Sequence, residues 1–328
     1  MDFGLTQFQK GILFFMVLIL INYGTVYYYD KFVKNIYEQP FEGFEDVNDK
    51  HVTDVKTDPV QIYDAFYAKI YNLLTQGEKR TLAKVVFNIN YWKKLQPAFE
   101  ISKWSVLDAG CGTGIASGAY AKMGAGKVVG LDSSAPMIEE AQAALEKNKD
   151  LKPEQKQVVT FRNDTMMNPS ACSAGEFTHI VVYYFSIYYL QDKETFFRNA
   201  YMWTLPSGRM AIEVVNKYKF DPILDSANPL VGFSLQKYSK ERITKSSVAF
   251  NTFDYDASFA LESDKVGTFS ETFRFKNGNV RRQKHYLYMT AIPDIIKSAS
   301  LAGWKYEKYE DLTTADFEYG YLLYFVKG

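Results

Sequence analysis

The chain has 328 residues, 47% of them hydrophobic, which is enough to bury one large core or two modest ones. Lys and Arg total 38, as do Asp and Glu, so no net charge attracts nucleic acid, and a sequence-independent DNA-binding protein is disfavoured. Two cysteines, Cys111 and Cys172, and three histidines show no metal-ligand spacing, which predicts reduced thiols and no metal site.

The N-terminal region predicts a membrane anchor. After a tail at residues 1–10, residues 11–29 carry no charged side chain and lie between Lys10 and Asp30. Nineteen helical residues rise about 28 Å, close to the hydrocarbon thickness of a bilayer. A cleaved signal peptide and a buried helix are the alternatives, but no small-x-small cleavage site follows the apolar run. Residues 30–58 are expected to form a polar linker.

A globular domain is expected from residue 59 to the end of the chain. Residues 60–76 are predicted to form a helix, and residues 78–99 a second one. In the first helix an aromatic residue recurs every four positions on one face, at Tyr63, Tyr67 and Tyr71. This face either closes over a ligand or packs into the core.

The most informative segment is VLDAGCGTG, residues 106–114. A short apolar run predicts a buried strand, and Gly110, Gly112 and Gly114 then form a tight turn in which no Cβ atom keeps a ligand away from the backbone. A helix predicted over residues 115–123 directs its N-terminal amide groups at this loop. The segment therefore favours a nucleotide-like ligand over a glycine turn that binds nothing.

The spacing of the glycines distinguishes between two families. In the G-x-G-x-x-G pattern of nicotinamide-dependent dehydrogenases, the third glycine would fall on Thr113 or Ser117. The pattern here is D-x-G-x-G-x-G, which resembles the first motif of class I S-adenosylmethionine-dependent methyltransferases. A nicotinamide-dependent oxidoreductase is kept as an alternative.

Strands and helices alternate after the glycine loop, which indicates an α/β fold with a mostly parallel sheet covered on both faces. Helices are predicted at 135–147 and 193–203, and strands at 127–131, 157–161, 179–184 and 209–215.

The C-terminal end resembles the reversed hairpin of the same family. A helix predicted at 292–302 precedes a strand near 305–309 and a last strand at 319–326. The resemblance implies a doubly wound, seven-stranded Rossmann-like sheet with an antiparallel last strand.

Residues 216–290 interrupt this order with β-like alternation and are expected to form a β-rich cap over the substrate, as in many small-molecule methyltransferases. The dipeptide Asn277-Gly278 predicts a two-residue hairpin. That hairpin would place Glu271 opposite Lys284 on the neighbouring strand, with Arg282 diagonal to it.

The resemblance implies a set of residues that bind S-adenosylmethionine. Asp132 ends the second strand, where a carboxylate can accept hydrogen bonds from both ribose hydroxyls, although a helix N-cap is an alternative. Asp164 resembles the acid that binds the adenine amino group but is also a typical turn residue. Cys111 is interpreted as a space-filling side chain. The complete cofactor set is Tyr63, Tyr67, Asp108, Gly110, Cys111, Gly112, Gly114, Asp132, Ser133, Met137, Asn163, Asp164, Thr165 and Tyr184.

Methyl transfer requires alignment, exclusion of water and, when the acceptor must lose a proton, a general base. His285 is the candidate base, although a lone histidine on a strand is often structural, and Tyr184 is a second candidate at the carboxyl end of its strand.

We expect a methyltransferase acting on a small-molecule or lipid-like acceptor, with no nucleic-acid partner. Because S-adenosylmethionine is made in the cytosol, the domain is expected on that side of the membrane. A catalytically inactive S-adenosylmethionine-binding scaffold is another alternative.

Overall fold

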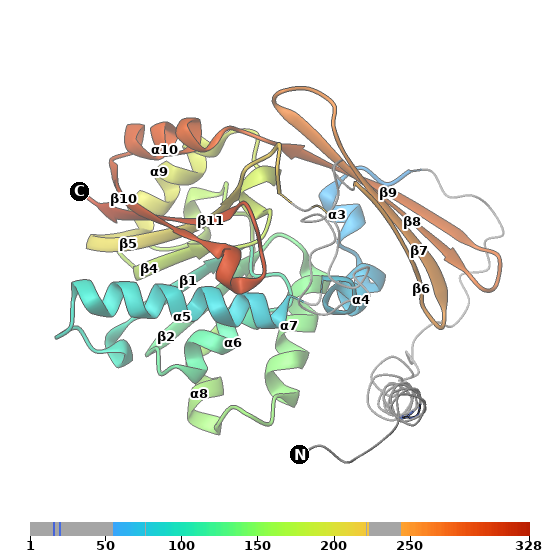
Figure 1. Cartoon of the computed structure of the whole chain (residues 1–328). Helices are drawn as coiled ribbons and strands as arrows, with labels where there is room; N and C mark the ends of the chain where they lie inside the picture. The colour runs from blue at the N-terminus through green and yellow to red at the C-terminus, as the bar shows by residue number, and fades with distance from the viewer. Residues whose placement is uncertain (1–15, 17–19, 21–54, 76, 221, 223–243) are drawn as a thin grey trace, which may run out of the picture.

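The computed structural model describes residues 55–75, 77–220, 222 and 244–328, together with Met16 and Leu20. A seven-stranded sheet has the order β10-β11-β5-β4-β1-β2-β3 (Figure 1). Its strands are β1 (Ser105–Ala109), β2 (Lys127–Asp132), β3 (Val159–Asn163), β4 (Phe177–Val182), β5 (Thr204–Val215), β10 (Trp304–Asp311) and β11 (Gly320–Lys327). The five neighbouring strands β3, β2, β1, β4 and β5 run parallel to one another. Strand β11 pairs antiparallel with both β5 and β10. The expected doubly wound sheet with an antiparallel last strand is confirmed.

Helices cover both faces of this sheet, with α5 and α6 on one face and α9 and α10 on the other (Figure 1). Because both faces are covered, the central strands are continuous apolar runs, and Val106 and Leu107 of β1 are fully buried. The helices are α5 (Glu78–Leu95), α6 (Ile115–Lys122), α7 (Ala135–Lys147), α8 (Pro153–Gln157), α9 (Lys193–Trp203) and α10 (Ile292–Leu301).

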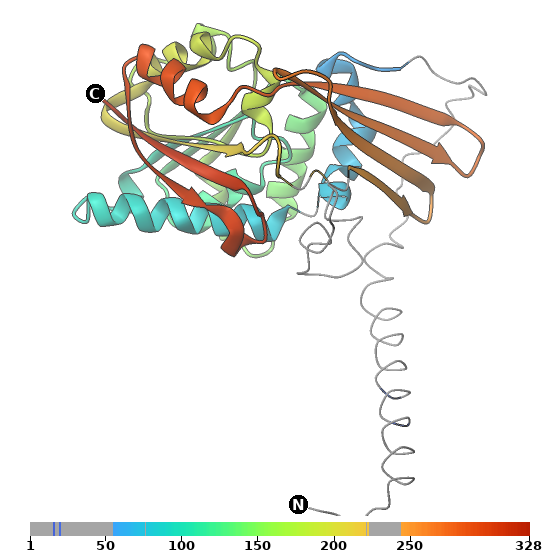
Figure 2. The ribbon, with the colours of Figure 1, turned by 45° about the horizontal axis from the view of Figure 1, so that its top comes forward.

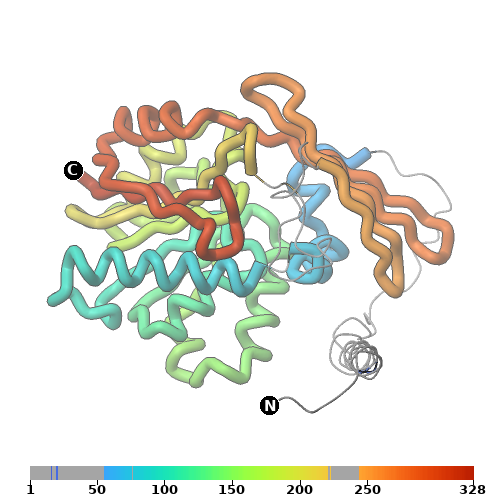
Figure 3. The backbone as a smooth tube through the Cα atoms, in the orientation of Figure 1, coloured from blue at the N-terminus to red at the C-terminus, as the bar shows by residue number. Residues whose placement is uncertain are grey.

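A second sheet lies between β5 and α10 in the sequence and forms the predicted cap. Its antiparallel strands are β6 (Lys245–Ala249), β7 (Phe253–Leu261), β8 (Val266–Phe275) and β9 (Val280–Tyr288). The helices α3 (Pro59–Ile62) and α4 (Ala65–Thr75) lie between the two sheets (Figure 2). After β9 the chain returns directly to α10 on the main sheet (Figure 3). The cap therefore stands beside the carboxyl ends of the parallel strands.

The edge strand β9 also pairs with the segment that precedes α3. The backbone N–H of Lys56 donates to the carbonyl of Arg282 at 3.0 Å, and the N–H of Lys284 donates to the carbonyl of Lys56 at 2.9 Å. This parallel bridge covers part of the exposed edge of the sheet. The Lys56 ammonium then pairs with Asp64 at 2.7 Å.

The predicted register of the β8–β9 hairpin is wrong by one residue. Glu271 lies opposite Gln283, and Lys284 lies opposite Ser270. The connection is longer than a two-residue turn, because the last pair of the ladder joins Arg274 to Val280. A shift of one residue moves a side chain to the other face of a sheet, so Glu271 is buried instead of pairing with a lysine at the surface.

The helix predicted over residues 60–76 is broken in two. Asp64, between α3 and α4, accepts the backbone N–H of Tyr67 at 3.1 Å and so satisfies an amide of the first turn of α4. Its carboxylate also accepts two hydrogen bonds from Arg281 Nη1, at 2.8 and 2.9 Å. The break therefore connects the helix pair to the cap.

The predicted anchor at residues 11–29 lies outside the described residues, except for Met16 and Leu20. Residues 30–54 of the predicted linker also lie outside them. Within the described ranges, no helix has the length and apolar character needed to cross a bilayer.

Candidate functional site

The glycine loop connects β1 to α6 at the edge of the main sheet nearest the cap. Gly110, Gly112 and Gly114 have φ angles of 77°, 52° and 77°, in the left-handed region that favours glycine. The N–H of Gly110 donates to the carbonyl of Leu131 at 2.7 Å, which holds the loop against the end of β2. The backbone thus has the conformation that the sequence predicts for close approach of a ligand.

Gly114 is restricted by space as well as by its backbone angle. A Cβ atom there would lie 2.8 Å from Phe161 Cζ and 3.0 Å from Ala141 Cβ, whereas at Gly124, also at positive φ, nothing lies within 4 Å.

Gly124→Ala is expected to lower the free energy of unfolding by about 1–2 kcal/mol, from backbone strain alone. Gly114→Ala is expected to cost about 1–3 kcal/mol more, from overpacking. Urea unfolding of both variants measures the difference, and equal losses would contradict this explanation.

Asp132, the last residue of β2, organises the loop. Its Oδ2 accepts the N–H of Gly112 at 2.9 Å, and its Oδ1 accepts the N–H of Ser134 at 2.9 Å. Ser134, not Asp132, is the N-cap of α7, since its hydroxyl accepts the N–H of Met137. Burial raises the pKa of the Asp132 carboxyl. Asp132 is therefore not the N-cap of α7, and its carboxylate lies beside the glycine loop.

Two further side chains of the predicted cofactor set are buried under the loop. Ser117 Oγ donates to Asp108 Oδ2 at 2.7 Å, and burial raises the pKa of Asp108 to about 6. Burial also raises the pKa of the Cys111 thiol well above its ordinary value. A thiol that stays protonated is a poor nucleophile, in agreement with a space-filling role for Cys111.

The residues after β3 meet the same edge of the sheet. Asn163 Nδ2 and the N–H of Asp164 both donate to the carbonyl of Asp132, at 3.0 and 3.1 Å. The Asp164 carboxylate accepts the N–H of Thr165 at 2.7 Å and Nδ2 of Asn168 at 2.9 Å, so Asp164 forms a turn. Ser133, Asn163 and Thr165 are exposed at the surface. This turn brings the predicted adenine-side residues beside the predicted ribose-side carboxylate.

The helix α4 lies directly on the glycine loop. Thr113 Oγ1 donates to Asn72 Oδ1 at 2.7 Å, and the Tyr71 ring lies 3.9 Å from the position of a Cβ on Gly112. Ser134 Oγ donates to the carbonyl of Tyr63 at 2.6 Å. Tyr63 therefore lies beside the end of β2, whereas Tyr67 is buried in a core cluster with Met137 and donates to Glu271 at 3.0 Å. The role of Tyr63 and Tyr67 as a lid over the cofactor stays a prediction.

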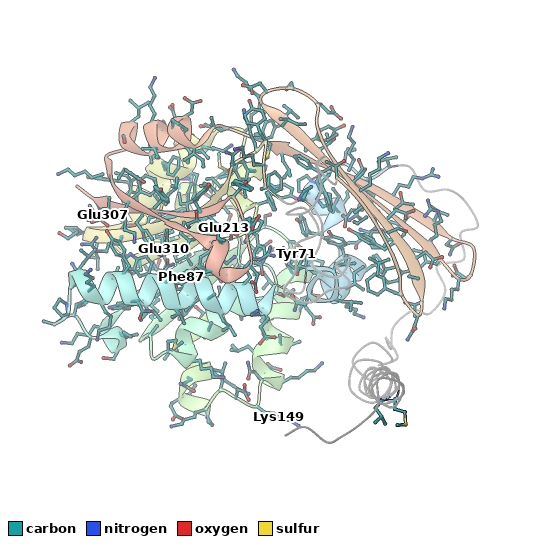
Figure 4. All side chains as sticks on the ribbon, in the orientation of Figure 1. Tyr71, Phe87, Lys149, Glu213, Glu307 and Glu310 are labelled. Carbon is teal, nitrogen blue, oxygen red and sulfur yellow. The ribbon has the colours of Figure 1, made fainter. Side chains whose placement is uncertain are left out.

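A pocket opens between Tyr63, Tyr67 and Tyr71, the ends of β4 and β5, and the cap. Ten of its lining residues carry a phenyl or phenol ring. The lining consists of Tyr63, Tyr67, Tyr71, Thr75, Arg80, Tyr184, Phe185, Ser186, Tyr189, Glu213, Phe220, Pro222, Phe259, Phe269, His285, Leu287 and Phe317. Figure 4 shows Tyr71 and Glu213 on the side of the main sheet that faces the cap. A mostly apolar pocket with a few polar groups is typical of small-molecule sites.

His285 is held at this pocket by hydrogen bonds on both ring nitrogens. Its Nε2 lies 2.6 Å from Glu271 Oε2, and its Nδ1 lies 2.6 Å from the hydroxyl of Tyr189. The Tyr189 hydroxyl is also 2.9 Å from that of Tyr63. Because an ionised carboxylate only accepts, Nε2 carries the proton and Nδ1 accepts from Tyr189. The histidine is therefore in a defined tautomer, with its basic nitrogen on the Tyr189 side.

Glu271 is the centre of this buried network. In addition to His285, it accepts hydrogen bonds from Tyr67 at 3.0 Å, Tyr255 at 2.6 Å and Gln283 Nε2 at 2.5 Å. Burial raises the pKa of Glu271, but His285 and these donors offset burial, and the net shift is downward. Neither Glu271 nor Tyr189 is in the predicted set of site residues. Tyr189 lies in an aromatic-rich stretch visible in the sequence, whereas the role of Glu271 depends on the register.

Tyr184 lies two residues beyond β4, at a φ angle of 53°. Its hydroxyl donates to the carbonyl of Gly77 at 2.8 Å and lies 2.7 Å from Thr81 Oγ1. The hydroxyl is thus engaged with α5 and its N-cap, and the ring forms part of the pocket wall. The backbone N–H of Tyr184 donates to Glu213, which also pairs with the buried Lys84 at 2.6 Å.

Comparisons with known proteins agree with this geometry. Residues 106–208 match the family model described as a methyltransferase domain. No curated protein sequence matches the chain.

Solved structures share the fold at low sequence identity. The methyltransferase CcbJ from Streptomyces caelestis is 15% identical, with a TM-score of 0.58 over 83% of this chain and 98% of that one. CalS10 from Micromonospora echinaspora, an amino pentose methyltransferase solved with S-adenosylmethionine bound, is 14% identical, with a TM-score of 0.53 over 85% and 100%. The sugar N-methyltransferase KedS8 from Streptoalloteichus is 19% identical, with a TM-score of 0.53 over 84% and 97%.

Proposed function

We propose that this chain is an S-adenosylmethionine-dependent methyltransferase and that it methylates a small-molecule acceptor held in the pocket between the glycine loop and the cap. One observation carries the proposal: His285, held by Glu271 and Tyr189, lines the same pocket as Tyr63 and Tyr71, which lie over the glycine-loop edge. The amino pentose and sugar acceptors named for two similar structures support an acceptor of this size.

The residues around the loop fit the cofactor. S-adenosylmethionine supplies a methyl group on a sulfonium, and transfer requires alignment and exclusion of water. We assign Asp132 to the ribose hydroxyls and Asp108 to the side of the methionine ammonium. Asp164 is assigned to the adenine edge. The support is their common position around three glycines that leave the backbone open.

His285 removes the proton that an amine or hydroxyl acceptor must lose. Tyr189 donates to His285 Nδ1, so it can pass its own proton to the histidine while it takes one from the acceptor. Burial raises the pKa of Tyr189, so the tyrosine stays protonated between turnovers. Glu271 stabilises the imidazolium that forms. Tyr184 serves as a wall, since α5 and its N-cap engage its hydroxyl.

The assignment of Asp108 predicts a pH dependence. An ionised Asp108 attracts an ammonium, and its pKa of about 6 means that the carboxylate is lost as the pH falls below that value. Affinity for S-adenosylhomocysteine should therefore fall between pH 7 and pH 5, by up to about tenfold per pH unit below 6. Calorimetry measures this, and Asp108→Asn should remove the dependence.

The same group affects stability in the opposite direction. The folded-state pKa lies above the unfolded value, so between about pH 4 and 6 the folded state binds more protons, and stability falls as pH rises through this window. Weaker cofactor binding at pH 5 cannot then be attributed to destabilisation by Asp108. An affinity that is constant from pH 5 to 7 would contradict the assignment.

Transfer of labelled methyl groups from S-adenosylmethionine into a lipid and metabolite extract tests the function. A labelled product that requires the protein is expected, and it would exclude an inactive scaffold. Calorimetry with NAD tests the oxidoreductase alternative: binding of NAD without binding of S-adenosylhomocysteine would overturn the proposal.

We further propose that residues 11–29 anchor the chain in a membrane with the domain on the cytosolic side. The support is the uncharged sequence of these residues and the cytosolic origin of the cofactor. Alkaline extraction of membranes from cells that make the full chain tests the anchor. Recovery of the protein in the soluble fraction would contradict it.

A further inference from the structure

Among the described residues that line the pocket, Glu213 has a carboxylate oxygen that accepts no hydrogen bond. Glu213 on β5 is 2% exposed, and its Oε2 accepts from Lys84 Nζ at 2.6 Å and from the N–H of Tyr184. Its Oε1 has no partner within the part of the chain that the structure describes, although Glu213 lines the pocket. The residue lines the pocket, so this oxygen can be reached from the pocket. A bound ligand can supply a donor.

Lys84 fixes this carboxylate in place. The lysine is fully buried on α5, and its Nζ lies 4.1 Å from the centroid of the Tyr184 ring and 4.9 Å from that of Tyr183. Burial lowers the pKa of Lys84, and the contact with Glu213 opposes this shift. The lysine occupies only Oε2, so the pair leaves Oε1 pre-oriented for a ligand (Figure 4 labels Glu213).

The surroundings of Glu213 favour a cation. Tyr63, Tyr71 and Tyr189 line the same pocket, and tyrosine rings attract ammonium groups through their faces. Arg80 also lines the pocket, but its guanidinium lies over the Phe317 ring, 4.4 Å from the centroid, and donates to the carbonyl of Asp316. An ammonium group can donate a charge-assisted hydrogen bond to Oε1 and contact the rings at the same time.

Building on the methyltransferase function proposed above, we propose that Glu213 binds the amino group of the acceptor, and that the substrate class is a small amine. The bound ammonium donates one N–H to Oε1 and loses one proton to Tyr189, which passes its own to His285. The lone pair thus freed forms the N–C bond as the S–C bond breaks. The positive charge of the sulfonium ends on the methylated amine.

A matched pair of probes tests the assignment. Cyclohexylamine, protonated at pH 7.5 as lysine is, and cyclohexanol have similar shapes and differ in the group that meets Glu213. Their dissociation constants are measured by ligand-observed NMR on the full chain, with and without S-adenosylhomocysteine. We expect the amine to bind about tenfold more tightly than the alcohol. We expect the variant Glu213→Gln to lose this preference while still binding S-adenosylhomocysteine.

Glu262→Gln is the control, since Glu262 pairs with Lys284 on the outside of the cap and is absent from the pocket lining. This control should keep the preference for the amine. Equal affinities of amine and alcohol for the unmodified chain would overturn the proposal, whether or not the Glu213 variant folds. An unchanged preference in folded Glu213→Gln would also overturn it. Failure of S-adenosylhomocysteine to bind would contradict the proposed function instead, because the probe preference is measured without it as well.

Discussion

Asp132→Ala is expected to lower the affinity for S-adenosylhomocysteine by at least about 100-fold. The carboxylate has two tasks, since it accepts the N–H groups of Gly112 and Ser134 and is assigned to the ribose hydroxyls. Hydrogen bonds to charged groups contribute about 1.5–3 kcal/mol each, so loss of two ribose contacts alone accounts for this factor. Titration calorimetry at pH 7.5 measures the change.

Asp150→Ala is the matched control for this experiment. Asp150 is an exposed carboxylate paired with Lys122 at 3.1 Å, and exposed pairs of this kind contribute about 0–1 kcal/mol. Its replacement should leave the affinity unchanged. Near-normal affinity of folded Asp132→Ala would refute the ribose assignment.

His285→Asn is expected to lower kcat by about 100- to 1,000-fold, the usual contribution of a general base. The affinity for S-adenosylhomocysteine should change much less than kcat, because the hydrogen bonds of His285 go to Glu271 and Tyr189 and it meets Tyr63 and Tyr67 only through ring contacts. Turnover is measured with the acceptor that the labelling assay identifies. Tyr189→Phe should show a similar loss, since it removes the hydroxyl that relays the proton.

The variant Glu271→Gln distinguishes a catalytic role of His285 from a purely structural one. An amide at this position has the shape of the carboxylate but no charge to stabilise the imidazolium, so the acidic limb of the pH profile of kcat should shift to lower pH. A purely structural histidine would give a folded His285→Asn protein with normal kcat, and that result would remove His285 from the mechanism.

The sequence predicted those parts of the site that depend on short segments. The glycine loop, Asp132 and the turn at Asp164 lie within a few residues of strand ends, and the structure brings them together as expected. Residues that directly follow parallel strands lie at the same edge of the sheet, so their spacing from the strand ends predicts their positions. Predictions that rest on residues 11–29 concern the part of the chain outside the described residues.

The missed residues depend on contacts between distant segments. Glu271 lies opposite Gln283 and beside His285 because the hairpin connection is longer than the two-residue turn that Asn277-Gly278 predicts. Lys84 and Glu213 are 129 positions apart, and neither has a local signal of its own. This pair forms only when helix α5 packs on the sheet, and the sequence pattern of either segment alone does not predict that packing.

The bridge between Lys56 and β9 determines how force enters the molecule. Tension applied to the preceding chain reaches β9 through two backbone hydrogen bonds, and the connection between α3 and α4 through the Lys56–Asp64 pair. Arg281 on β9 joins the same carboxylate. Tension on the chain before Lys56 therefore acts on the cap and on the α3–α4 pair before it acts on the seven-stranded sheet.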